Sequence, residues 1–206
     1  MKYFKEQLKY SSIYELINPI FQRYLLFIWV CNGKTSTTPH LIKQQVVRKY
    51  ATEYGLNTFV ETGTYLGAMV DAVKNIFDKV YTIEIDKKLY ERAKKKFASD
   101  HNVTVLSGDS GEVLPKVLTK LKTPTLFWLD AHYSGGITAR GEVETPILEE
   151  LKQVLKHKKD KVILVDDAVS FVGKGGYPSL GNVKELATKR YKNHSFRVEE
   201  NIIVIK

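Results

Sequence analysis

From residue 57 onward, short apolar runs typical of β-strands alternate with longer amphipathic runs typical of α-helices. Five strand-then-helix units are followed by two further strand patterns that flank the turn Glu199-Glu200-Asn201. This alternation predicts an α/β fold: a Rossmann-like, mostly parallel, seven-stranded sheet with helices on both faces and a C-terminal antiparallel hairpin. The expected strands are residues 58–60, 80–83, 103–106, 125–129, 162–165, 195–198 and 202–205, and the expected helices between them are 69–77, 88–97, 113–121, 147–155 and 183–191.

Length and composition indicate one ordinary globular domain. The 206 residues are 43% hydrophobic, which allows a sizeable core, and they carry a formal net charge of +9. The single cysteine, Cys31, excludes an internal disulfide and a multi-cysteine zinc site, and it favours a reducing compartment. The longest apolar stretch, residues 24–31, has eight residues, whereas roughly 20 are needed to span a bilayer. With no secretory signal pattern at the start, we expect a cytoplasmic protein.

The first 56 residues differ in character from the rest, because they hold eight Lys and Arg against three Asp and Glu. Asn18-Pro19 is typical of a helix start and Asn32-Gly33 of its end, with apolar side chains at helical spacing between them. A second helical pattern covers residues 41–54. We therefore expect residues 1–56 to form a basic, helical N-terminal extension and residues 57–206 to form the main domain. The apolar helix face could dock on the same chain, form a homodimer, or make peripheral contact with an anionic membrane surface.

Polar residues follow the first three predicted strands, where ligands bind in sheets of this type. The first strand leads into Glu61-Thr62-Gly63-Thr64-Tyr65-Leu66-Gly67, whose glycines allow a tight turn and a close approach of the backbone to a cofactor. Glu84 follows the second strand, 21 residues after Gly63, in position to bind both hydroxyls of a ribose. After the third strand, Asp109 can accept from an adenine amino group, and Ser110 is a candidate helix N-cap. Together these features predict a site for a nucleoside-type cofactor.

A second group of side chains follows the fourth and fifth strands. Asp130 and His132 come after the fourth strand, and Asp166 and Asp167 after the fifth. Three carboxylates at the ends of adjacent strands repel one another, so a fold keeps them when a cation lies among them. Oxygen ligands of this kind suit Mg²⁺, Mn²⁺ or Ca²⁺. The sequence therefore predicts either a divalent metal site, or aspartates that cap helices and accept from loop N–H groups.

The order of these motifs resembles that of the class I methyltransferases that use S-adenosylmethionine. The aspartate arrangement resembles that of the metal-dependent O-methyltransferases, and the Asp166-Asp167 pair is more similar to the sugar-type (macrocin-type) enzymes than to the catechol and caffeoyl-CoA enzymes. The resemblance implies transfer of a methyl group to a hydroxyl of a sugar, a glycan or a glycosylated small molecule. It also implies the metal ligands Asp130, Asp166 and Asp167 and the cofactor-binding residues Glu61, Gly63, Thr64, Tyr65, Gly67, Glu84, Asp109, Ser110 and Asp130. His132 is not a general feature of the class, and its position beyond Asp130 makes it our candidate general base, with Asp130 as the second catalytic residue.

Three alternatives remain open at this point. The first is a metal-independent methyltransferase in which His132 is the base and the aspartates are structural. The second is a nucleic-acid methyltransferase or binder, favoured by the net charge of +9 but opposed by the nearly balanced charge after residue 56 and by the absence of an Asn-Pro-Pro-Tyr type signature after the fourth strand. The third is a non-catalytic interaction protein that acts through its N-terminal helix.

Overall fold

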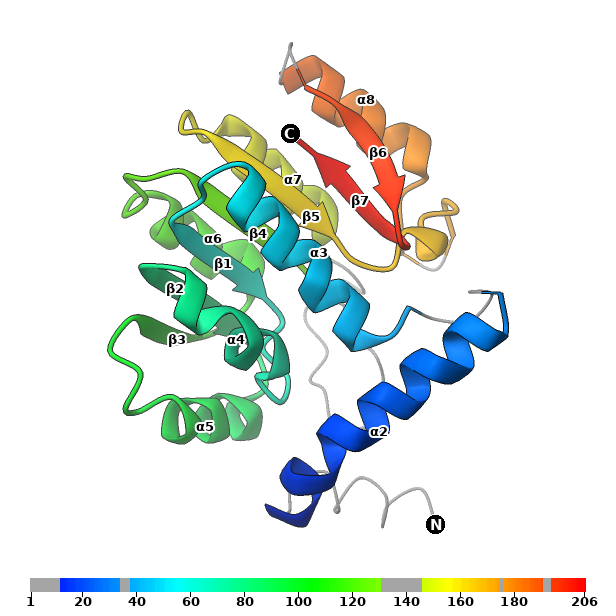
Figure 1. Ribbon diagram of the computed structural model, residues 1–206. Coiled ribbons are helices and arrows are strands. Elements are labelled where there is room, and N and C mark those ends of the chain that lie inside the picture. The colour runs from blue at the N-terminus through cyan, green and yellow to red at the C-terminus, as the bar shows by residue number, and fades with distance from the viewer. Residues whose placement is uncertain (1–11, 34–37, 131–145, 175, 191–193) are drawn as a thin grey trace.

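The computed structural model describes residues 12–33, 38–130, 146–174, 176–190 and 194–206 (Figure 1). The strands are β1 (Thr58–Thr62), β2 (Lys79–Glu84), β3 (Val103–Ser107), β4 (Thr125–Leu129), β5 (Lys161–Val165), β6 (Phe196–Glu199) and β7 (Ile202–Ile205). The α-helices are α2 (Ser12–Cys31), α3 (His40–Glu53), α4 (Ala68–Val73), α5 (Lys87–Lys96), α6 (Ser110–Leu118), α7 (Ile147–Lys156) and α8 (Leu180–Arg190). Two short 3-10 turns, η1 (Lys74–Ile76) and η2 (Ala168–Ser170), complete the described elements.

The strands form one seven-stranded sheet in the order β3-β2-β1-β4-β5-β7-β6. The first five strands are parallel, whereas β7 runs antiparallel to both β5 and β6. The predicted α/β architecture with its C-terminal hairpin is therefore confirmed. Glu200 and Asn201 connect the hairpin with φ values of 49° and 63°, as a two-residue turn that follows the twist of the strands requires.

Side chains along each central strand alternate between two hydrophobic clusters, one on each face of the sheet. In β4, Leu126 and Trp128 belong to the first cluster, whereas Phe127 and Leu129 belong to the second. Helices α3, α4 and α5 contribute to the first cluster, and α6, α7 and α8 contribute to the second (Figure 1). Because both faces of the parallel strands are covered, their polar groups are concentrated at the strand ends.

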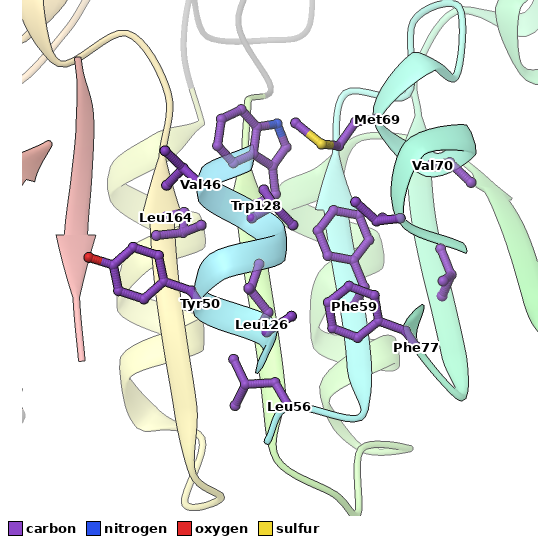
Figure 2. Close-up of a cluster of buried hydrophobic side chains, with 14 of the residues drawn as sticks. Val46, Tyr50, Leu56, Phe59, Met69, Val70, Phe77, Leu126, Trp128 and Leu164 are labelled. Atoms are coloured by element: carbon purple, nitrogen blue, oxygen red, sulfur yellow. The ribbon is translucent and has the colours of Figure 1, made fainter. Parts of the chain in front are cut away.

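Helix α3 is an integral part of the first cluster, although its residues lie within the expected N-terminal extension. Its buried side chains are Val46, Val47, Tyr50 and Ala51. Figure 2 shows Val46 and Tyr50 over β4 and β5, near Trp128 and Leu164. The Tyr50 hydroxyl donates a 2.8 Å hydrogen bond to Glu199 Oε2, which joins α3 to the C-terminal hairpin. The hydrophobic core of the sheet domain therefore includes residues on the N-terminal side of residue 56.

Helix α2 contacts α3 and extends away from the sheet (Figure 1). It starts at Ser12 and continues through Asn18 and Pro19, so the expected helix start at Asn18-Pro19 is wrong. A proline inside a helix removes one backbone donor, and here it does not end the helix. Trp29 is buried, whereas apolar side chains elsewhere on α2 are exposed: Ile20, Phe21, Tyr24, Phe27, Ile28 and Val30. No described helix is long and apolar enough to cross a membrane.

Candidate functional site

The loop between β1 and α4 follows the glycine pattern seen in the sequence. Gly63 and Gly67 have φ values of 86° and 73°, in the left-handed region that favours glycine. A Cβ atom at Gly67 would lie 2.8 Å from the Phe97 ring, so the close packing of the loop on α5 also requires a glycine. The N–H groups of Gly63 and Thr64 donate to the Ile83 carbonyl at 3.0 and 3.3 Å, which holds the loop beside the end of β2.

Glu84 is held at the end of β2 by the backbone of two loops. Its Oε2 accepts a 2.8 Å hydrogen bond from the N–H of Tyr65, and its Oε1 accepts a 2.9 Å hydrogen bond from the N–H of Asp86. Burial raises the pKa of the Glu84 carboxyl, and the two backbone donors oppose that rise. Tyr65 adopts a φ of 50°, which is uncommon for a residue with a side chain and which aims its N–H at this carboxylate. The arrangement fixes the carboxylate in one orientation beside the glycine loop.

Glu61 lies at the end of β1 and is almost fully buried. Its Oε2 accepts a 2.5 Å hydrogen bond from the Thr82 hydroxyl, which lies 2.5 Å from the Thr64 hydroxyl. Burial raises the pKa of Glu61 well above its ordinary value, and the carboxylates of Asp130 and Glu84 raise it further. A cationic group placed beside Glu61 would favour the ionised form of this carboxyl.

Asp109 and Ser110 lie between β3 and α6, as predicted, but their local roles differ from the expectation. Asp109 is the N-cap of α6, because its Oδ1 accepts a 2.8 Å hydrogen bond from the N–H of Gly111. Ser110 is the first residue of the helix and is buried, so the expectation of an N-cap role for Ser110 is wrong. The aspartate carboxylate takes the cap since it reaches the free N–H groups of the first turn.

Glu150 is a buried carboxyl that the sequence reasoning missed. It lies on the inner face of α7, fully buried, and neither oxygen makes a well-formed hydrogen bond. Burial raises its pKa to about 7, although the hydroxyls of Ser110 and Thr62 lower it in part. Ile147, Leu151 and Val154 share the buried face of the same helix. An acidic residue at a core position of an amphipathic helix is the signal that could have identified it.

The three predicted aspartates are brought together at the ends of β4 and β5. Asp166 is buried, and burial and the Asp130 carboxylate raise its pKa to about 7. Lys43, from α3, lies among them: its Nζ is 2.5 Å from Asp166 Oδ2 and 3.4 Å from Asp167 Oδ1. Burial lowers the pKa of Lys43, but the carboxylates of Asp166, Asp167 and Asp130 raise it above its ordinary value. The sequence predicted either a divalent metal ion among these aspartates or structural roles for them, and in the structure a lysine ammonium lies beside Asp166 and Asp167.

This arrangement does not fit the expected divalent metal ion. Both carboxylate oxygens of Asp166 are engaged, Oδ2 by Lys43 and Oδ1 by the N–H of Asp167 at 2.8 Å. Within the described ranges, no three His, Cys, Asp or Glu side chains converge closely enough to hold a metal. An ammonium beside these oxygens also repels a second cation. The Asp166 carboxylate therefore suits the lysine ammonium and not a divalent metal ion.

Two histidines are candidates for proton transfer at this site. His132, the predicted base, lies outside the described residues. His40, the first residue of α3, is partly buried, and burial and Lys43 lower its pKa, whereas the Asp130 carboxylate opposes that shift. A histidine in this environment is neutral at physiological pH and can accept a proton. His40 was not singled out from the sequence, and Lys43 was missed although it lies three residues before the buried Val46.

Comparison with solved structures identifies the fold. The O-methyltransferase from Bacillus cereus, solved in complex with SAH, has a TM-score of 0.58 at 12% identity, covering 96% of this chain and 97% of its own. The O-methyltransferase TomG from Streptomyces achromogenes, solved with SAM, has a TM-score of 0.56 at 17% identity, covering 79% of this chain and 78% of its own. The 23S rRNA methyltransferase ErmE has a TM-score of 0.53 at 14% identity, covering 83% and 69%. The chain has the class I methyltransferase fold.

Part of the chain also matches the model of a methyltransferase family, but this family acts on RNA. The family of ribosomal RNA adenine dimethylases matches residues 37–123. This segment contains α3 and the strands β1, β2 and β3 with their loops, and it ends just before β4. The match therefore covers the part of the fold that holds Glu61, Glu84 and Asp109, and it excludes Asp130 and Asp166.

The buried carboxyl of Glu150 predicts a specific dependence of stability on pH. Between pH 4.5 and about 7 the folded chain keeps a proton on Glu150 that the unfolded chain has lost. The stability that this group contributes is therefore fully present below about pH 4.5 and is lost progressively as pH rises from there to about 7. Glutamine does not ionise, so Glu150→Gln does not lose this stability as pH rises. We expect the variant to gain up to about 3 kcal/mol in unfolding free energy over the natural chain between about pH 5 and pH 8.

Urea denaturation at several pH values measures this difference. Glu149→Gln is the matched control, because Glu149 is the preceding residue on α7 and its side chain is exposed. We expect Glu149→Gln to follow the pH profile of the natural chain. Parallel profiles for all three proteins would contradict the assignment of a raised pKa to Glu150.

Proposed function

We propose that this chain is an S-adenosylmethionine-dependent methyltransferase that methylates a hydroxyl oxygen. The observation that carries the proposal is the fixed Glu84 carboxylate beside the Gly63–Gly67 turn, at the C-terminal edge of a class I methyltransferase sheet. A carboxylate at this place can accept hydrogen bonds from both ribose hydroxyls of a nucleoside cofactor. Loops at this edge are where ligands bind in doubly wound sheets.

The remaining acidic groups suit the charge of the cofactor. The adenine amino group can donate to Asp109 Oδ2, because Asp109 Oδ1 is the oxygen used for capping α6. The methionine part of the cofactor carries an ammonium group and a positively charged sulfonium. Glu61 and Asp130 lie near enough to each other to interact electrostatically, and a cationic ligand between them would relieve that repulsion. We therefore place the methionine part of the cofactor beside the loop that holds Gly63, Thr64, Tyr65 and Gly67.

The acceptor half of the site is formed by the ends of β4 and β5. Carboxylates accept hydrogen bonds from hydroxyl groups, so Asp130 and Asp167 suit an acceptor rich in hydroxyls, such as a sugar, a glycan or a glycosylated small molecule. The deprotonated acceptor oxygen attacks the methyl carbon in line with the carbon–sulfur bond. That bond breaks, its electron pair neutralises the sulfonium, and S-adenosylhomocysteine leaves. His132 is the proposed base, and its proton comes from the acceptor hydroxyl.

A nucleic-acid substrate is the second candidate, and the match to the rRNA adenine dimethylases favours it. Two observations oppose it. The match ends at residue 123, before the strand ends that select the acceptor, and β4 is followed by Asp130-Ala131-His132-Tyr133 rather than by an Asn-Pro-Pro-Tyr type signature. The described strand ends also carry many carboxylates, which repel a polyanion. The single cysteine, Cys31, supports action in the reducing cytoplasm.

Cofactor binding tests the first part of the proposal. Titration calorimetry with S-adenosylmethionine should show saturable binding to the natural chain. We expect Glu84→Gln to weaken that affinity roughly 10- to 100-fold, because hydrogen bonds from the ribose to a charged acceptor are lost. The exposed Glu91 on α5 offers the control Glu91→Gln, for which we expect unchanged affinity. Absence of binding by the natural chain would overturn the proposed activity.

The acceptor class is tested by transfer of a labelled methyl group from S-adenosylmethionine. The natural chain is incubated separately with a panel of deoxysugars and glycans and with ribosomal RNA, and the products are identified by mass spectrometry. We expect O-methylated sugar, and we expect His132→Ala to lower its rate at least about 100-fold without changing cofactor affinity. Dimethyladenine in the RNA, with no sugar product, would select the second candidate. Loss of activity in His40→Ala but not in His132→Ala would assign the base to His40.

A further inference from the structure

Lys43 occupies the centre of the acceptor half of the site, although it belongs to a helix far from the aspartates in sequence. Its ammonium bridges Asp166 Oδ2 at 2.5 Å and Asp167 Oδ1 at 3.4 Å. The exposed fractions of the three side chains are 12% for Lys43, 2% for Asp166 and 21% for Asp167, so this is a largely buried ion pair. The cluster is anchored by α3, whose neighbouring side chains Val46 and Val47 are buried against the sheet.

The Lys43 ammonium lies beside the aspartate oxygens that a bound metal ion would contact. A divalent ion binds carboxylate oxygens at about 2.0–2.6 Å, so it competes for the oxygen of Asp166 that Lys43 already holds. Removal of one partner from a buried ion pair leaves an uncompensated charge, which is strongly unfavourable. Displacing the lysine ammonium from these two carboxylates is therefore unfavourable unless another cation takes its place.

An ammonium group has three N–H donors. Among the described residues, Lys43 donates to two oxygen atoms, one from Asp166 and one from Asp167. With respect to the described part of the chain, the third donor is available for a ligand oxygen. Because Asp130 also interacts electrostatically with Lys43, this donor lies within the same group of strand ends as the proposed acceptor.

We propose that Lys43 is the fixed cation of the acceptor site: it holds Asp166 and Asp167 in place of a divalent metal ion and donates its remaining N–H to the acceptor oxygen. This inference rests on the proposed methyl transfer for the role of the acceptor. As the acceptor hydroxyl loses its proton, negative charge develops on the oxygen, and a donor from an ammonium stabilises that charge. Lys43 itself keeps its proton, so it orients and stabilises the acceptor while a histidine removes the proton.

Manganese binding tests the first part of this inference without any assay of activity. Titrations with Mn²⁺, followed by electron paramagnetic resonance, are carried out on the natural chain, on Lys43→Met and on Lys43→Met combined with Asp166→Asn. We expect the natural chain to bind Mn²⁺ weakly and Lys43→Met to bind it at least about tenfold more tightly, since the ammonium that repels the ion and holds the Asp166 oxygen is then absent. Asp166→Asn in the double variant should abolish the gain.

Two further variants separate this effect from a general loss of charge. Lys49 lies on the same helix and forms a 2.5 Å ion pair with Glu199, away from the aspartates, so Lys49→Met is the matched control. We expect neither Lys49→Met nor Lys43→Arg, which keeps the cation, to gain affinity for Mn²⁺. Tight binding of Mn²⁺ by the natural chain that Asp166→Asn abolishes would overturn the inference, and this arm does not depend on the stability of any Lys43 variant. A folded Lys43→Met that gains no affinity would also overturn it.

Kinetics test the second part. We expect methyl transfer by the natural chain to be unchanged by excess EDTA, and Lys43→Met to lower kcat/KM for the acceptor at least about tenfold while the affinity for S-adenosylmethionine stays the same. Lys43→Arg should recover part of the loss, and Lys49→Met should match the natural chain. Transfer abolished by EDTA would overturn the inference. Failure of the proposed function can be told apart from failure of this inference. If the proposed function is wrong, the natural chain does not bind S-adenosylmethionine, whatever the Mn²⁺ titrations show.

Discussion

The concentration of carboxyl groups at the C-terminal edge of the sheet is the constraint on which the rest of the structure depends. Buried carboxylates close to one another raise each other's pKa and oppose folding unless donors or cations compensate them. Each of these carboxyl groups is stabilised in a different way. Backbone N–H groups donate to Glu84, and a threonine hydroxyl donates to Glu61. Burial favours the protonated form of Glu150, and the Lys43 ammonium pairs with Asp166. Because these partners come from separate elements, the site is complete only when α3 and α7 are packed on opposite faces of the sheet.

In the proposed function, the site divides into a cofactor half and an acceptor half. The ends of β1, β2 and β3 form the proposed cofactor half, and the match to the family of ribosomal RNA adenine dimethylases, over residues 37–123, covers these strands. The ends of β4 and β5, together with Lys43 from α3, form the acceptor half. Solved structures of O-methyltransferases and of an rRNA methyltransferase resemble the chain to a similar degree, with TM-scores of 0.58, 0.56 and 0.53. Likeness of fold therefore does not distinguish between the two classes of acceptor.

The sheet and the positions of the glycine turn and Glu84 at its edge were predictable because their signals are local. Apolar strand patterns, the glycine turn and the 21-residue step to Glu84 are each contained in a short stretch of sequence. Lys43 was not predictable in its role, because its partner Asp166 is 123 residues away and only the packing of α3 on the sheet brings them together. The helix start at Asn18-Pro19 was mispredicted because the local signal for a first turn also occurs inside α2, and Asp109 took the cap expected of Ser110 because both residues suit that role.

A crystal structure of the complex with S-adenosylhomocysteine, grown in the presence of Mn²⁺ and measured at the manganese absorption edge, would show whether Lys43 or a metal ion holds the aspartates. We expect the cofactor ribose to contact Glu84 and Lys43 Nζ to stay within hydrogen-bond distance of Asp166 and Asp167. We also expect no anomalous peak between Asp130 and Asp166. An anomalous peak at that position with Lys43 displaced, or a cofactor bound away from Glu84, would contradict these expectations.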